Sequence, residues 1–148
     1  MKRDIKFRGK RTDNGEWEYG YCVVDPVGGH RIYRKPFDKA TSNTYYFVIP
    51  ETVGQYSGLN DNCDVMIFEG DIIREYENDN SGYGSWECFC VLEYGEYHCG
   101  AHTYIQWRCF EIKDGVKTGA SAPLSRHSTY LLEVIGNIHD NPELLTKN

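Results

Sequence analysis

The sequence lacks any apolar run long enough to cross a membrane, which takes about 20 consecutive apolar residues in a helix. It also lacks an apolar signal core, because Met1-Lys2-Arg3-Asp4 leads directly into a strand-like pattern. These two absences argue against a membrane protein and against export. We therefore expect a cytoplasmic protein with no membrane partner.

Common enzyme signatures are missing as well. The sequence contains no P-loop, no dinucleotide fingerprint, no HExxH and no GxSxG. Glu69 and Asp71 resemble a pair of catalytic acids, but they flank Gly70 at the start of a strand, where such side chains usually serve the turn. We therefore assign no catalytic residue and expect no cofactor, and an enzyme is not the favoured class.

Aromatic residues and glycine are plentiful, with twelve Tyr, six Phe, three Trp and fifteen Gly among 148 residues. This composition favours strands and turns over helices, so we predict a mostly β fold. The alternating residues Trp17, Tyr19 and Tyr21 predict a hairpin strand, and we assign residues 1–49 to an N-terminal β-hairpin region. Residues 50–148 form the predicted body, although one compact domain overall fits the length equally well. The nearly continuous β-prone run at 44–49 predicts a strand buried on both faces.

Four stretches carry a resemblance to a known family: IKFRGK at 5–10, TVGQYSGL at 52–59, FEGDII at 68–73 and EVIGNIHDNPELL at 133–145. In these stretches the chain resembles the YopX family of phage and prophage proteins. The motif positions are Thr52, Val53, Gly54, Gln55, Tyr56, Gly58, Leu59, Glu69, Gly70, Asp71, Gly136, Asn137, Asn141 and Pro142. The resemblance implies an SH3-like small β-barrel body and a bacterial host cell, but no established activity.

The sequence departs from the family pattern at one turn. Asp64 stands where the family usually has Gly, and because Asp tolerates left-handed backbone better than most residues, we expect the turn to survive. At the C-terminal end the resemblance favours a strand over 134–138. A helical turn should begin at Pro142, because proline suits the first helical position.

Six cysteines are present: Cys22, Cys63, Cys88, Cys90, Cys99 and Cys109. Without signs of export, reduced thiols are expected rather than disulfides. Cys88-x-Cys90 lies in an alternating strand, whereas structural zinc usually pairs ligands across two to four residues. We therefore expect no metal, and His98, Cys99 and His102 near the Gly100 turn are weak candidates for ligands.

Charge is divided unevenly along the chain. Residues 1–36 carry a net charge of +4, residues 37–148 carry −10, and the total is −6. We therefore expect an interface in which Lys2, Arg3, Lys6 and Arg8 of one molecule contact the acidic body of another. Together with the surplus of aromatic residues, this split predicts a non-catalytic phage or prophage accessory module that forms a homo-oligomer and binds an unknown protein partner. A head-to-tail contact and an exchanged hairpin both fit.

The alternative function is nucleic-acid binding by a small β-barrel, through weak contacts. A surface for base stacking and phosphate contact is available from Tyr19, Tyr21, Arg31, Tyr33, Arg34 and Lys35. Against this alternative, a sequence pI near 5.3 gives a background that repels phosphate. A metal-dependent enzyme is less favoured than either class.

Overall fold

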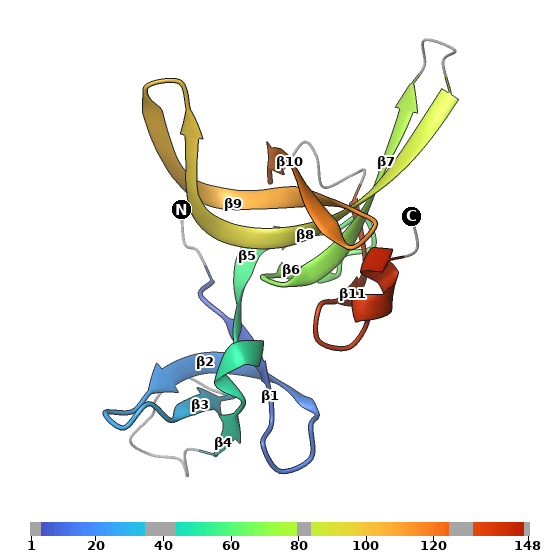
Figure 1. The fold of residues 1–148 in the computed structure, drawn as a ribbon. Helices are drawn as coiled ribbons and strands as arrows, with labels where there is room; N and C mark the ends of the chain where they lie inside the picture. Colours follow the sequence, from blue (N-terminus) through green and yellow to red (C-terminus); the bar gives the residue numbers. More distant parts are fainter. Residues whose placement is uncertain (1–3, 35–43, 80–83, 125–131, 147–148) are drawn as a thin grey trace. The chain divides into compact units, whose positions relative to one another are not determined.

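The computed structural model describes residues 4–34, 44–79, 84–124 and 132–146, with the side chains of 77–79, 84–87 and 99 left out. The chain forms two compact units, residues 1–58 and residues 59–148. The described residues are mostly β, in two antiparallel sheets, with two short 3-10 turns (Figure 1). None of their helices is long and apolar enough to span a bilayer.

The first sheet has the strand order β4-β3-β2-β1-β5-β6. Its strands are β1 (Phe7–Lys10), β2 (Trp17–Val24), β3 (His30–Tyr33), β4 (Tyr45–Val48), β5 (Gly54–Asn60) and β6 (Met66–Phe68). The 3-10 turn η1 (Pro50–Thr52) separates β4 from β5. The unit boundary at residues 58 and 59 falls inside β5.

Strands β1 to β4 form an antiparallel meander around a small core. Ile32 and Val48 are the buried apolar residues of this core, with exposed fractions of 0% and 2%. Gly20 lies opposite Phe7, and a Cβ atom there would overlap the carbonyl oxygen of Tyr33. Glycine is therefore required at position 20, because it lets β2 and β3 approach closely.

The edge strand β4 also contacts the end of β1. Arg11 pairs with Val48, the Ile49 amide donates to the Lys10 carbonyl at 2.8 Å, and the Thr12 amide donates to the Phe47 carbonyl at 3.0 Å. These bonds satisfy backbone groups that an edge strand otherwise exposes. They curl the first sheet without closing it into a barrel.

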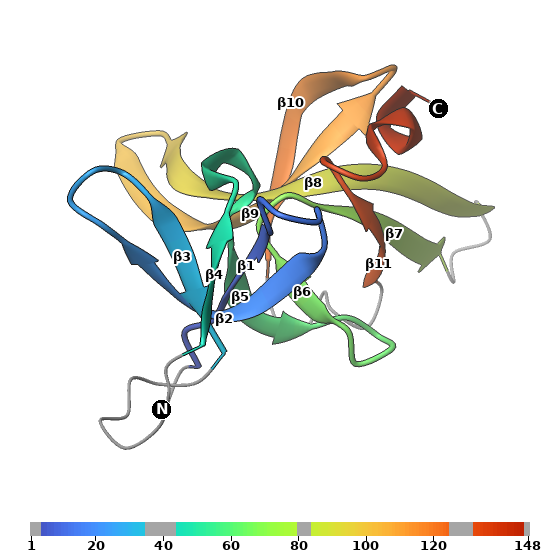
Figure 2. The same ribbon diagram turned by 90° about the horizontal axis from the view of Figure 1, so that it is seen from below.

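The second sheet has the order β10-β9-β8-β7-β11. Its strands are β7 (Asp71–Asp79), β8 (Gly84–Cys99), β9 (His102–Lys113), β10 (Val116–Pro123) and β11 (Leu132–Asn137). Figure 2 shows β11 beside β7, with the 3-10 turn η3 (Pro142–Thr146) following it. The predicted final strand and the start of η3 at Pro142 are confirmed, whereas β10 was not anticipated because its sequence is small and polar.

The SH3-like barrel expected for residues 50–148 is not confirmed, and neither sheet closes in the described part of the chain. A barrel requires its two edge strands to meet, but the edges of the second sheet, β10 and β11, remain apart in the strand order. Strand β8 pairs with β7 over residues 84–91 and with β9 over residues 89–99, so its two partners overlap along only a short stretch.

The second sheet buries apolar residues on both faces. One cluster comprises Ile67, Ile73, Cys90, Leu92, Trp107, Cys109 and Leu132. The other face buries Ile72, Val91 and Ile112, against which Leu144 and Leu145 of η3 pack. The alternation along β7 and β8 assigns neighbouring residues to opposite faces, which is the expected period of a strand.

Candidate functional site

The outer face of the first unit gathers aromatic side chains from three adjacent strands. The register pairs Tyr21 with Tyr33 and Tyr33 with Tyr45, while Tyr19 and Phe47 follow on the same face two residues away. We call Tyr19, Tyr21, Tyr33, Tyr45 and Phe47 the aromatic face. The ring centroid of Tyr45 lies 5.3 Å from that of Tyr33 and 5.6 Å from that of Phe47, so these side chains form a connected surface.

Most of the aromatic face is solvent-exposed. The exposed fractions are 45% for Tyr19, 42% for Tyr45 and 46% for Phe47. The prediction that the strand at 44–49 is buried on both faces is therefore wrong. In β4 only Val48 is buried, because Tyr45 and Phe47 lie on the opposite face of the strand, which is exposed to solvent. Sequence reasoning missed Tyr45 and Phe47 for this reason, since a continuous apolar run does not show which side meets solvent.

Arg31 is the cation among these rings. Its guanidinium carbon lies 5.1 Å from the Tyr45 centroid and 4.9 Å from the Phe47 centroid, within the range of cation–π attraction. The same guanidinium forms an ion pair with Asp25 at 2.8 Å. The Asp25 carboxylate therefore neutralises much of the positive charge on this face.

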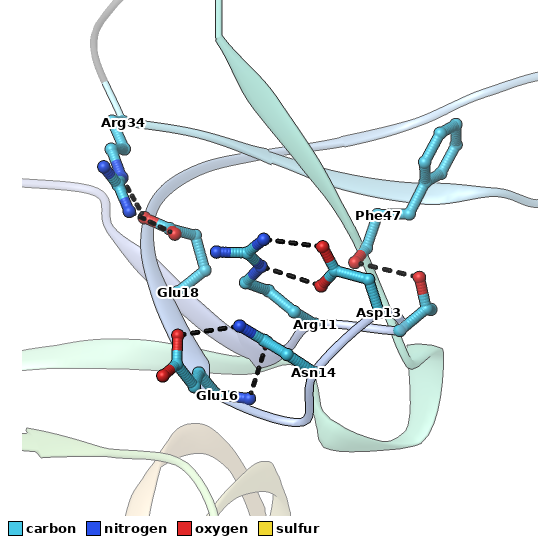
Figure 3. Close-up of polar contacts among 8 residues, drawn as sticks. Arg11, Asp13, Asn14, Glu16, Glu18, Arg34 and Phe47 are labelled. Atoms are coloured by element: carbon cyan, nitrogen blue, oxygen red, sulfur yellow. Dashed lines mark hydrogen bonds and ion pairs between the residues drawn. The ribbon is translucent and has the colours of Figure 1, made fainter.

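Arg34 does not lie on the aromatic face with Arg31, although the sequence had suggested that both belong to one nucleic-acid-binding surface. It pairs with Glu18 through two hydrogen bonds of 2.7 and 2.9 Å (Figure 3). Arg11 pairs in the same way with Asp13, at 2.9 and 2.6 Å. Their guanidinium carbons lie 4.9 and 3.9 Å from the Tyr46 ring centroid. Because Tyr46 alternates with Tyr45 and Phe47 along β4, both arginines attach to the side opposite the aromatic face.

The two ion pairs shift the ionisation of their members. The hydrogen bond from Arg11 lowers the pKa of Asp13, and the hydrogen bond with Asp13 raises the pKa of Arg11. The hydrogen bond with Glu18 likewise raises the pKa of Arg34. These arginines are structural cations of the first unit, each already committed to a carboxylate.

The basic residues proposed as an interface are only partly described. Lys2 and Arg3 lie outside the described residues, as does Lys35 of the proposed nucleic-acid surface. Lys6 forms an exposed ion pair with Asp4 at 3.1 Å. Arg8 has an exposed fraction of 6% and lies 4.7 Å from the Trp17 ring centroid, so it packs within the protein.

The family-motif residues around β5 to β7 build turns. The Thr52 hydroxyl accepts from the Lys10 amide at 2.8 Å and donates to the Ile49 carbonyl. Val53 links η1 to β5, and β5 contains Gly54, Gln55, Tyr56, Gly58 and Leu59. Asp71 is buried, and its carboxylate accepts from the Phe68 amide at 2.7 Å. Glu69 and Gly70 lie in the turn between Phe68 and Asp71. As expected from sequence, Asp64 adopts left-handed backbone, with φ of 63°.

The C-terminal motif residues form a second turn. The Asn137 side-chain oxygen accepts from the amides of His139 and Asp140, both at 3.0 Å. A Cβ atom at Gly136 would come within 2.5 Å of the Asn141 side-chain oxygen, so a larger residue there would displace the Asn141 side chain. Pro142 then begins η3. The hydrogen bonds in these turns stabilise the protein's own backbone.

The weak metal candidates lie at the tip of the β8–β9 hairpin. The register pairs His98 with Thr103 and Cys99 with His102, which places His98 and His102 on opposite faces of the hairpin. His98 Nδ1 lies 3.0 Å from the Thr103 hydroxyl, and both histidines are exposed. Cys88, Cys90 and Cys109 instead share a face of the second sheet nearer its middle.

Comparisons with known proteins agree with the motif resemblance. The sequence profile of the YopX family, described as YopX protein, matches residues 6–146. The crystal structure of protein EF1440 from Enterococcus faecalis is similar, with a TM-score of 0.54 and 22% identity, over 97% of this chain and 99% of that chain. At this identity the likeness shows the fold alone. A comparison with curated proteins gives no match.

Proposed function

The chain belongs to the YopX family, and we propose that it is a non-catalytic phage or prophage accessory module that self-assembles and docks a protein partner through the aromatic face. The carrying observation is the exposure of adjacent aromatic side chains around Arg31 on one sheet surface. Aromatic residues and arginine supply most of the binding energy at protein interfaces. Contiguous apolar patches of this kind are uncommon on surfaces that bind nothing.

The charges on the aromatic face favour a protein over a polyanion. Arg31 is already paired with Asp25, and Arg8 is buried over Trp17. Phosphate contacts require cations that can exchange small counterions for the nucleic-acid backbone. A protein surface with apolar groups and a hydrogen-bond acceptor for Arg31 suits this face better, because it needs no surplus of positive charge.

Self-assembly is tested by light scattering of the full chain at tens of micromolar, in low and high salt. We expect an oligomer at low salt that shifts toward monomer at high salt, because the net charges of +4 over residues 1–36 and −10 over residues 37–148 attract each other between copies. Phe47→Ala should leave the oligomer intact, because the aromatic face serves the partner, and so should the control Tyr104→Ala, whose tyrosine is exposed to 46% but lies on β9. A strict monomer in both salts would remove self-association from the proposal.

Partner binding is tested by capture from infected host cells, followed by reconstitution with the purified candidate. The partner should bind the unaltered chain and the Tyr104→Ala variant with equal affinity. It should bind Phe47→Ala at least about tenfold more weakly, because loss of one interface hot spot costs about 2 kcal/mol or more. Equal affinity for all three proteins contradicts docking through the aromatic face.

The non-catalytic part of the proposal has its own test. Nucleotides and nucleic acids are incubated with the protein under turnover conditions, with Glu69→Gln as the comparison. We expect no turnover. A reproducible turnover that Glu69→Gln abolishes, in a variant that keeps its circular dichroism spectrum, contradicts a non-catalytic module.

Single-stranded nucleic acid is the second candidate ligand, favoured by the stacking area of Tyr19, Tyr21 and Tyr33 beside Arg31. A salt series of fluorescence anisotropy with a labelled oligonucleotide separates it from the first candidate. Submicromolar binding at physiological salt with a steep salt slope, lost in Arg31→Gln, would rank nucleic acid above protein. We expect weak binding with a shallow slope.

A further inference from the structure

The middle of the second sheet brings together thiols and carboxylates from three strands. The register places Glu75 of β7 opposite Cys88 of β8, and Cys90 of β8 opposite Glu111 of β9. Cys109 lies on β9 two residues before Glu111, on the same face. Residues 89–91 of β8 are paired on both edges, so Cys90 has a strand on each side. The backbone around this cluster is therefore held in place on both sides.

The functional atoms of the cluster are close together. The ligand atoms of Glu75, Cys88 and Cys90 all lie within 4.8 Å of one another, and the Cys88 thiol donates to the Glu75 carboxylate at 3.7 Å. The Cys90 thiol donates to the Ile73 carbonyl at 3.6 Å. A cavity of about 250 Å³ is lined by Glu75, Cys88, Cys90 and Cys109, together with Glu111 and Ala120, Ser121 and Ala122 of β10.

The Glu75 carboxylate is half-buried in this cavity beside the thiols. Among the described residues, no lysine or arginine forms an ion pair with it. Carboxylate oxygens are accepted zinc ligands, and this carboxylate has no competing cationic side chain in that part of the chain.

We propose that Glu75, Cys88, Cys90 and Cys109 form a binding site for a thiophilic divalent metal ion, and that this ion is zinc. Three sulfur donors and one carboxylate oxygen give the four ligands of a tetrahedral zinc site. In such a tetrahedron, sulfur atoms about 2.3 Å from the ion lie about 3.8 Å apart. The ligand atoms of Glu75, Cys88 and Cys90 are within 4.8 Å of one another and need only a small approach, and Cys109 would join them from the same cavity. Bound zinc cross-links β7, β8 and β9, and its binding releases the protons of the coordinating thiols. This proposal is independent of the function proposed for the aromatic face.

The site escapes the usual sequence pattern for zinc. Ligands paired along one chain are typically separated by two to four residues, which suits loops and turns. Here one intervening residue suffices, because alternate residues of a strand share a face, and the register supplies the other two ligands. The His98, Cys99 and His102 group lacks this arrangement, since its two imidazoles lie on opposite faces of the hairpin.

The test uses the full chain, reduced and stripped of metal with a chelator, then titrated with Zn²⁺. We expect one zinc per chain by mass spectrometry of the desalted protein, and a rise in melting temperature. Co²⁺ should give the charge-transfer absorption of bound thiolates. Cys88→Ser, Cys90→Ser and Glu75→Gln should weaken zinc binding by at least about 10- to 100-fold, the cost of losing even outer contacts of a metal site. Mg²⁺ should not compete, because it prefers oxygen ligands.

The chain offers a matched control for these variants. A protein carrying Cys22→Ser, Cys63→Ser and Cys99→Ser together retains only the three proposed thiol ligands, and it should bind zinc as the unaltered chain does. Glu75→Gln keeps the test valid if the cysteine variants do not fold, because it conserves the volume of the side chain and leaves every cysteine in place. Circular dichroism of each metal-free variant confirms that the strands remain.

Several outcomes would overturn the proposal. One is the absence of stoichiometric zinc in the reduced, unaltered chain. Another is zinc binding that the triple cysteine control abolishes, because the ligands would then lie elsewhere. Retention of full affinity in Cys88→Ser and Cys90→Ser would show that the cluster is packing alone. Equal uptake of zinc and magnesium would indicate carboxylate binding and contradict a thiolate site.

Discussion

At the scale of single residues, Gly20 marks the tightest backbone contact of the first unit. Gly20→Ala should lower the free energy of unfolding by about 2 kcal/mol, the cost of forcing an extra carbon into a filled space, because the new Cβ overlaps the Tyr33 carbonyl. Urea unfolding measures the loss. Gly95→Ala in β8 is the control, since nothing lies within 4 Å of its added Cβ. Equal losses in the two variants would contradict the contact.

The Arg11–Asp13 pair gives a prediction for acid pH. The pKa of Asp13 lies below its ordinary value near 3.8, because the Arg11 hydrogen bond favours the carboxylate. The stabilisation is therefore present above pH 3.8 and is lost as the pH falls through the lowered native pKa. Asp13→Asn should be less stable than the unaltered chain at neutral pH, and the two should converge in acid.

Chemical denaturation at a series of pH values measures this convergence. The pair is exposed, so the difference should be small and should shrink at high salt. A difference between the two proteins that grows toward acid pH would contradict the assignment of the pKa shift to Arg11.

At the scale of elements, Asp61 joins the β5–β6 turn to β11. One carboxylate oxygen accepts from the amides of Cys63 and Val65, and the other accepts from the Val134 amide at 2.9 Å. Asp61→Asn should cost about 2 kcal/mol, because the new amide nitrogen faces a backbone donor and leaves it unsatisfied. Hydrogen exchange should increase at Val134 before it increases in β8.

A second aspartate in the same turn provides a control with the same change of charge. Asp64→Asn keeps an oxygen that can accept from Asn60 Nδ2, which donates to Asp64 at 2.6 Å. Asparagine also tolerates the left-handed backbone at position 64. Its stability should change little. If Asp64→Asn destabilises the protein as much as Asp61→Asn, the effect is one of charge and not of the bonds to β11.

The turn residues also show how much of the fold could be predicted from sequence. The left-handed position of Asp64, the final strand and the start of η3 at Pro142 follow from local backbone preferences, and all three are confirmed. Strand β10 was missed because its stability comes from pairing with β9, which its own small polar residues do not reveal. The barrel is not confirmed for a related reason: closure depends on whether the two edge strands pair with each other, which is long-range pairing, and in the described part of the chain neither sheet closes.

The candidate sites show the same limit. Tyr19, Tyr21, Tyr33 and Arg31 were identified from sequence, and the register does place them on one face. Tyr45 and Phe47 could not be added, because an apolar run leaves open which side is covered. The thiols of Cys88, Cys90 and Cys109 were interpreted as packing, since their convergence with Glu75 depends on three strands lying in register. The sequence therefore predicts which residue types form a local surface, but it does not predict which strands pair and in what register.

At the scale of the whole molecule, each unit has its own buried apolar residues. Ile32 is fully buried in the first unit, and Leu92 is fully buried in the second. Truncating either side chain to alanine removes apolar contacts and leaves a cavity, at a cost of about 3 kcal/mol. The two variants therefore have similar expected costs but act on different cores.

Hydrogen exchange of the native protein distinguishes the two cores. Ile32→Ala should accelerate exchange in β1 to β4 and leave the amides of β7, β8 and β9 protected, because the bonds that protect those strands lie in the second sheet. Leu92→Ala should give the reverse pattern. Tyr104→Ala, an exposed truncation, should alter neither. If Ile32→Ala accelerates exchange equally in both sheets, unfolding is a single cooperative event, and the division into units at residues 58 and 59 has no energetic counterpart.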